Sequence, residues 1–169
     1  MKTKFLTLVM MYLFVSCQNK SNIESVSTSS PSGDSTSNTL SEVKTISISL
    51  DSLKNFNGKK LMQDGLFEKF GIMTRIEKLM GKDFVDFKTG WGEESALMKD
   101  GEVMYANACK KDNCKSLKIL LVLDELTNNL NVYVFNNSKI KTYEESHIIG
   151  LTETIGAQYE KLRDEQNSK

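Results

Sequence analysis

Two cysteines that enclose four polar residues form the part of this sequence best suited to chemistry. The segment consists of Cys109, Lys110, Lys111, Asp112, Asn113 and Cys114. Two ammonium groups, a carboxylate and an amide within six residues can pair with charged groups and exchange hydrogen bonds. Strand-like runs lie on both sides, so we interpret the segment as a protruding loop. These residue types favour binding to a partner over catalysis.

Catalytic and metal-binding interpretations have less support. His147 is the only histidine, and no nucleophile motif surrounds it, so we interpret it as a capping or surface residue. One histidine and a single pair of nearby cysteines do not suffice for a tetrahedral zinc site, and the pair lacks the Cys-x-x-Cys redox spacing. We interpret Glu93-Glu94 and Glu144-Glu145 as solvated acids. We therefore expect a protein that is not an enzyme and uses no metal or cofactor.

The N-terminus has the features of a bacterial export signal. Two lysines precede an apolar run from Phe5 to Val15, which has the length of a signal-peptide core and is too short to span a bilayer. The following Phe14-Val15-Ser16-Cys17 resembles the lipoprotein signal, in which the cysteine is lipidated and becomes the new N-terminus, although Phe14 replaces the usual leucine. We predict a lipoprotein signal peptide over residues 1–16, with a plain secretory signal as the alternative.

Export determines how the other cysteines are interpreted. The chain has three cysteines, and assigning Cys17 to lipid leaves Cys109 and Cys114 as a pair in an oxidising compartment. We predict a disulfide between them. A bond that closes so small a ring removes roughly 2 kcal/mol of unfolded-chain entropy and fixes the loop in one shape. The alternative is a staple that holds a hairpin together and binds nothing.

Length and composition indicate one modest domain with appendages, because 169 residues with 39% hydrophobic content leave no room for two large cores. Residues 18–41 include 12 Ser or Thr, which predicts a disordered tether after Cys17. The folded domain is then expected over residues 42–169. Removal of residues 1–16 leaves 20 basic and 22 acidic side chains. The mature chain therefore lacks the excess of basic residues that is typical of proteins that bind nucleic acid.

Helical and alternating patterns predict the elements of this domain. Residues 43–51 alternate as a strand or an extended arm, whereas 66–80 has helical spacing that ends at Gly81. A second short helix carries Phe84 and Phe87.

The second half is rich in predicted strands. Residues 95–98 and 103–107 form a hairpin around Lys99-Asp100-Gly101, and strands follow at 117–123 and 130–135 around a turn at 127–129. A final helix carries an apolar stripe made of Ile148, Leu151, Ile155, Tyr159 and Leu162. We predict an α+β fold, an antiparallel meander with helices packed on one face.

The loop and its surroundings resemble the inhibitors of vertebrate lysozyme. The similarity covers Leu79 to Phe135, including Leu79 to Phe84 before the hairpin and the stretch from Ala108 to Cys114. The family's loop reads Cys-Lys-Pro-His-Asp-Cys. In this chain Lys111 stands at the position of the proline, Asp112 at that of the histidine and Asn113 at that of the aspartate.

The resemblance implies an antiparallel sheet with helices against it, an envelope location, a homodimer, and a loop that enters the lysozyme cleft, where the family's histidine meets two catalytic carboxylates. We therefore expect a lipid-anchored protein, on the periplasmic face or the cell surface, that blocks a C-type lysozyme or related muramidase through the 109–114 loop. Lys110 or Lys111 can supply the cation, or Asn113 a hydrogen bond.

The alternative is a structural or adaptor envelope lipoprotein whose disulfide hairpin is only a staple. Asp112 keeps this alternative open, because a third negative group beside two carboxylates is repelled unless one of them takes up a proton.

Overall fold

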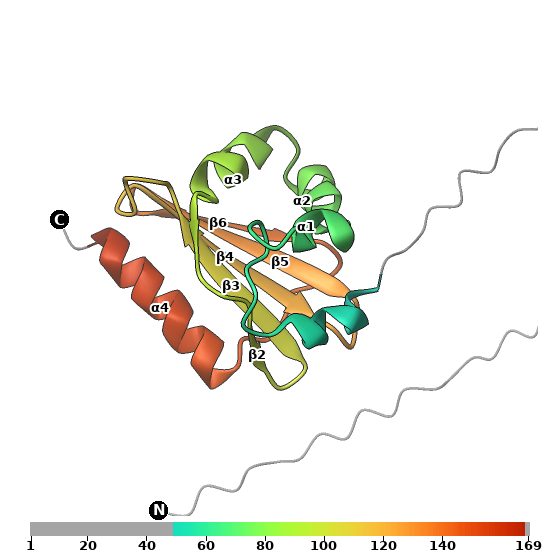
Figure 1. The fold of residues 1–169 in the computed structure, drawn as a ribbon. Coiled ribbons are helices and arrows are strands. Elements are labelled where there is room, and N and C mark those ends of the chain that lie inside the picture. The colour runs from blue at the N-terminus through green and yellow to red at the C-terminus, as the bar shows by residue number, and fades with distance from the viewer. Residues whose placement is uncertain (1–48, 168–169) are drawn as a thin grey trace, which may run out of the picture. The chain divides into compact units, whose positions relative to one another are not determined.

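An antiparallel β-sheet with helices on both faces forms the part of the chain that the structure, a computed structural model, describes: residues 49–167 (Figure 1). The predicted signal peptide over residues 1–16, Cys17 and the tether up to residue 41 lie outside these residues. Within residues 49–167, no helix is long and apolar enough to cross a membrane.

The sheet has its longest strands at its centre. Its strands are β1 (Glu93–Glu94), β2 (Met98–Asp100), β3 (Val103–Cys109), β4 (Leu117–Asp124), β5 (Asn129–Asn136) and β6 (Lys139–Glu144). They pair antiparallel in the order β1-β3-β4-β5-β6, and β2 also pairs with β3. The α+β class and the antiparallel meander are confirmed. The first hairpin strand begins at Met98 rather than at residue 95, and the strand β6 was not predicted.

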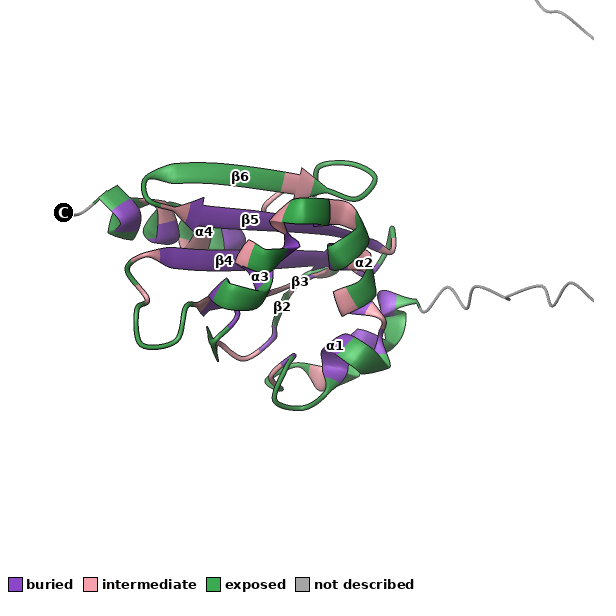
Figure 2. Ribbon diagram, turned by 90° about the horizontal axis from the view of Figure 1, so that it is seen from above, coloured by how far each residue is buried: buried purple, intermediate pink, exposed green. Residues whose placement is uncertain are grey.

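The two faces of the sheet carry separate apolar clusters. Strand β4 is buried along Leu117–Leu123, and its alternate residues point to opposite faces. Ile119 and Leu121 pack in the cluster beneath the N-terminal helices, whereas Leu120 and Val122 pack in the cluster with the C-terminal helix. Figure 2 shows β4 and β5 buried and β6 exposed at the edge. The helices thus divide between both faces instead of sharing one, because β4 is apolar on both sides.

The N-terminal helices cover one face. They are the 3-10 helices η1 (Leu50–Phe56) and η2 (Gly81–Asp83) and the α-helices α1 (Leu66–Lys69), α2 (Ile72–Met80) and α3 (Phe84–Gly90). The predicted helix over 66–80 is divided at Gly71, which has a left-handed φ of 59°, and it ends at Gly81 as expected. A strand was predicted over residues 43–51, and the structure describes residues 49–51 of it. There the prediction is wrong, because Ser49 caps the 3-10 helix η1, which starts at Leu50. Residues 43–48 lie outside the described range.

Helix α4 (Glu153–Asn167) covers the other face. The predicted stripe began too early, since Ile148 is 61% exposed and lies before the helix. The Thr152 hydroxyl accepts a hydrogen bond from the Ile155 N–H at 3.3 Å and so caps the N-terminus of α4. Tyr159 packs edge-on against the rings of Tyr133 and Phe135, with centroids 5.4 and 5.3 Å away.

Ionic contacts join the edge strand β6 to the N-terminal helices. The Asp83 carboxylate accepts hydrogen bonds from the Tyr143 hydroxyl at 2.7 Å and from the Lys141 ammonium at 3.0 Å. These two bonds lower the pKa of Asp83. Burial raises the pKa of Tyr143, and the hydrogen bond to Asp83 raises it further. Both pKa shifts keep Asp83 ionised and Tyr143 protonated near neutral pH, which is the state in which their hydrogen bond joins β6 to η2.

A second ionic contact corrects the interpretation of Glu145 as a solvated acid. The Arg75 guanidinium donates through Nε to the Glu145 carboxylate at 2.8 Å and through Nη2 to the Asn128 carbonyl at 2.7 Å. These bonds join α2, the β4–β5 turn and the segment after β6. Glu145 therefore has a structural role.

Candidate functional site

The segment between β3 and β4 is a short loop closed by a disulfide. Cys109 and Cys114 are bonded, with Cα atoms 4.8 Å apart, which confirms the predicted pairing. The Lys110 N–H donates to the Leu117 carbonyl at 3.0 Å, and the Asn113 N–H donates to the Lys110 carbonyl at 3.0 Å. The loop backbone is thus tied at its base and across its turn.

The polar side chains of the loop face solvent. Lys110, Lys111, Asp112 and Asn113 are all exposed. Within residues 49–167, neither lysine forms an ion pair. Two ammonium groups on a fixed backbone are therefore available to an external partner at small ordering cost.

The sheet edge at β1 braces one side of the loop. The Gly92 N–H donates to the Cys109 carbonyl at 3.1 Å, and the Glu93 carboxylate accepts the Asp112 N–H at 3.2 Å. Asp112 has a left-handed φ of 61°, which this bond holds in place. A Cβ on Gly92 would lie 2.5 Å from the Lys111 backbone nitrogen, so only glycine allows the loop to lie this close to β1.

The end of α4 braces the base of the loop from the other layer. Gln166 is only 7% exposed, and its side-chain amide donates to the Lys115 carbonyl at 3.0 Å. One residue earlier, Glu165 forms an ion pair with Lys118, whose side chain is almost fully buried. The 109–114 loop is therefore held by its disulfide, by β1 and by α4.

Glu94 anchors the chain segment that lies beside β1, which corrects its interpretation as a solvated acid. Its carboxylate accepts the backbone N–H groups of Met62 and Gln63 at 3.1 and 2.9 Å, and the Trp91 indole N–H at 2.9 Å. Trp91 itself is buried among aromatic rings. Glu94 thus fixes residues 62–63 next to the loop brace.

Sequence reasoning found the loop and missed the residues that position it. Glu93 bonds to Asp112 in the loop, 19 residues away in the chain, and Gln166 bonds to Lys115 at the base of the loop, 51 residues away. No short sequence pattern indicates such contacts. Gly92 lay outside every predicted element, so its close approach to the loop could not be predicted either.

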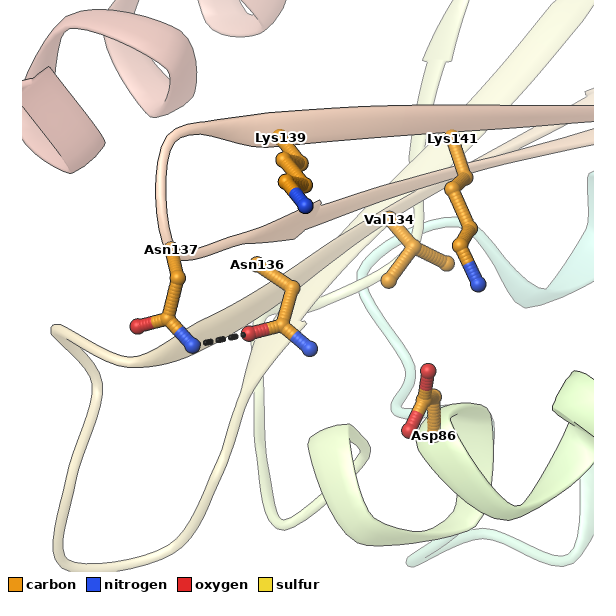
Figure 3. Close-up of a pocket in the computed structure, with 6 residues that line it drawn as sticks. All are labelled: Asp86, Val134, Asn136, Asn137, Lys139 and Lys141. Atoms are coloured by element: carbon orange, nitrogen blue, oxygen red, sulfur yellow. Dashed lines mark hydrogen bonds between the residues drawn. The ribbon is translucent and has the colours of Figure 1, made fainter.

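Two concavities lie at the same end of the sheet as the loop. A groove of about 490 Å³ is lined by Lys60, Met62, Gln63, Gly92, Glu93 and Glu94, on the β1 side. A pocket of about 250 Å³ lies between α3 and the β5–β6 hairpin, where Asp86 faces Lys141 and Val134 (Figure 3). The register places this hairpin beside the loop, because Leu117 pairs with Asn136.

Neither His147 nor the two cysteines form a catalytic or metal-binding site within the described residues. His147 is exposed, and its carbonyl accepts the side-chain amides of Asn129 and Asn131 at 2.9 and 3.0 Å, so it is a surface residue as expected. The Glu93 carboxylate and the two cysteine sulfurs lie within 4.8 Å of one another. Because these sulfurs are bonded to each other, they offer no thiolate to a metal.

The sequence matches a known protein family. The family model described as inhibitor of vertebrate lysozyme (Ivy) matches residues 71–162, which is more than half of the chain and includes β1 to β6 and the disulfide loop. No curated protein and no solved structure shows a significant match. The family comprises inhibitors rather than enzymes and binds lysozyme, a glycoside hydrolase. This chain belongs to the inhibitor of vertebrate lysozyme (Ivy) family.

Proposed function

We propose that this protein inhibits a C-type lysozyme or related muramidase by inserting the 109–114 loop into its active-site cleft. Family membership supports lysozyme as the class of partner. The observation that carries the proposal is the loop itself, which is closed by a disulfide, braced on two sides and tipped with exposed lysines. A rigid polar tip of this kind enters a cleft without a large ordering cost.

The charges of the loop suit a site with two carboxyl groups, the arrangement that cleaves glycosidic bonds. An ammonium group pairs with a carboxylate through a charge-assisted hydrogen bond, and Lys110 and Lys111 both have their ammonium groups available. The amide of Asn113 can donate a further hydrogen bond. Asp112 carries the unfavourable charge, and its backbone is fixed by Glu93 rather than by the partner.

We also propose a lipid anchor at Cys17 and a location in the cell envelope, on the periplasmic face or the cell surface of a bacterium. The order of basic residues, apolar run and cysteine supports this proposal, and so does the disulfide, because such bonds persist outside the reducing cytoplasm. The homodimer implied by the family resemblance stays a prediction.

The proposal is tested by the rate at which a C-type lysozyme clears a cell-wall suspension in the presence of the full-length protein. We expect dose-dependent slowing of the clearing rate. The variant Asp112→His is expected to inhibit about tenfold more strongly, because it removes a negative charge that faces two carboxylates. No inhibition by either protein would favour the adaptor interpretation, in which the disulfide is only a staple.

A further inference from the structure

The groove beside the loop has the position and the charge of a second contact surface. It is lined by Lys60, Met62, Gln63, Gly92, Glu93 and Glu94. We propose that it receives a lysine or arginine side chain from the rim of the target's cleft, and that this contact sets which enzyme the protein inhibits. The inference rests on the proposed function and names a further contact of the same partner.

The groove is continuous with the loop. Gly92 lines the groove, and its Cα approaches the Lys111 backbone so closely that a Cβ would lie 2.5 Å from the nitrogen. Glu93 also lines the groove and accepts the Asp112 N–H at 3.2 Å. A target that surrounds the loop therefore also covers the groove.

The free acceptor in the groove is Glu93. Both oxygens of Glu94 are occupied by three N–H donors. The Oε1 atom of Glu93 accepts the Asp112 N–H. Within residues 49–167, the contact of Oε2 is the Cys114 sulfur at 3.7 Å, and a disulfide sulfur carries no hydrogen to donate. Glu93 is exposed and can therefore accept hydrogen bonds from a cation.

Met62, which lines the same groove as Glu93, suits the stem of a long basic side chain. Met62 is 45% exposed, and its flexible thioether gives an apolar surface on which the methylene groups of lysine or arginine can lie. One lysine and two glutamates give the groove a formal charge of −1. The loop offers cations to the carboxylates of the cleft, and the groove offers an anion to a basic rim.

The groove wall also lies outside the region that defines the family. Lys60, Met62 and Gln63 precede residue 71, where the family match begins. This segment is held against the sheet by hydrogen bonds of Leu97 with Lys59 and Gly58, each 2.7 Å long. The segment is thus a fixed surface that lies outside the residues matched by the family model. Such a surface can differ between family members and so determine which enzyme is inhibited.

The test introduces a charge of either sign at Met62 and uses Met98, which is 44% exposed and outside the groove, as the matched control. Inhibition constants of the full-length Met62→Lys, Met62→Glu and Met98→Lys variants are measured against a C-type lysozyme, with melting temperatures as a check on folding. We expect Met62→Lys to weaken inhibition about tenfold through like-charge repulsion, and Met62→Glu and Met98→Lys to stay within about twofold of the parent protein.

The outcomes separate this inference from the proposed function. If Met62→Lys inhibits as well as Met98→Lys, or if Met62→Glu loses as much inhibition as Met62→Lys, no basic side chain occupies the groove and the inference is overturned. If the parent protein does not inhibit at all, the proposed function fails, and the inference fails with it.

Discussion

Replacement of both Lys110 and Lys111 by alanine is expected to weaken inhibition of a C-type lysozyme about a hundredfold, since close charge pairs at interfaces contribute roughly 1.5 kcal/mol or more each. The two ammonium groups are exposed and make no ion pair within residues 49–167, so the free protein loses no internal contact. The melting temperature should therefore stay unchanged. The loss should appear in the inhibition constant alone.

A matched control separates the position of these lysines from their charge. Lys78 on α2 and Lys161 on α4 are also exposed, and their replacement by alanine changes the net charge by the same amount. This control variant should inhibit as the parent protein does. Equal weakening by both double variants would mean that net charge steers the encounter and that the loop makes no specific contact.

Gly92→Ala is expected to weaken inhibition about tenfold and to lower the free energy of unfolding by about 1–3 kcal/mol, the cost of overpacking a fixed contact. The new Cβ would lie 2.5 Å from the Lys111 nitrogen and 2.8 Å from the Lys111 Cβ, so the loop must move away from β1. That movement breaks the bond between Glu93 and the Asp112 N–H, which holds the tip. Inhibition constants and thermal unfolding measure the two effects.

Gly150→Ala is the control for this substitution, because a Cβ at Gly150 meets nothing within 4 Å and its φ is not left-handed. Its inhibition constant and its stability should stay close to those of the parent protein. If Gly92→Ala behaves in the same way, the loop does not depend on its contact with β1, and the disulfide and the contacts at the base of the loop fix its shape.

The parts of the fold that could be predicted from sequence are those whose signal is local. The nearly continuous apolar run of residues 117–123 predicted the buried strand β4, and the Asp100-Gly101 turn predicted the hairpin that contains β3. Strand β6 escaped prediction because only Tyr143 is partly buried, so its sequence lacks an apolar face. The predicted start of helix α4 was too early because Ile148 and Leu151 continue the helical spacing of the apolar stripe toward the N-terminus. The helix begins after Thr152, whose hydroxyl caps it.

The candidate site shows the same division between local and distant signals. The spacing of the cysteines and the lysines between them identified the loop, and the disulfide follows from the cysteine count. The braces could not be predicted, because Glu93 reaches Asp112, and Gln166 reaches Lys115, only after the sheet and α4 have packed. Glu93 and Glu94 look alike in sequence, yet one holds the loop and the other holds residues 62–63.

The most direct test of the central claim, that the loop occupies the target's active-site cleft, is the pattern of inhibition. Initial rates of a C-type lysozyme on a soluble N-acetylglucosamine oligosaccharide are measured at several substrate and inhibitor concentrations with the full-length protein. Insertion of the loop predicts competitive inhibition, in which KM rises and kcat is unchanged, because substrate and loop need the same carboxyl groups. Inhibition that lowers kcat and leaves KM unchanged would place the contact outside the cleft and contradict the claim.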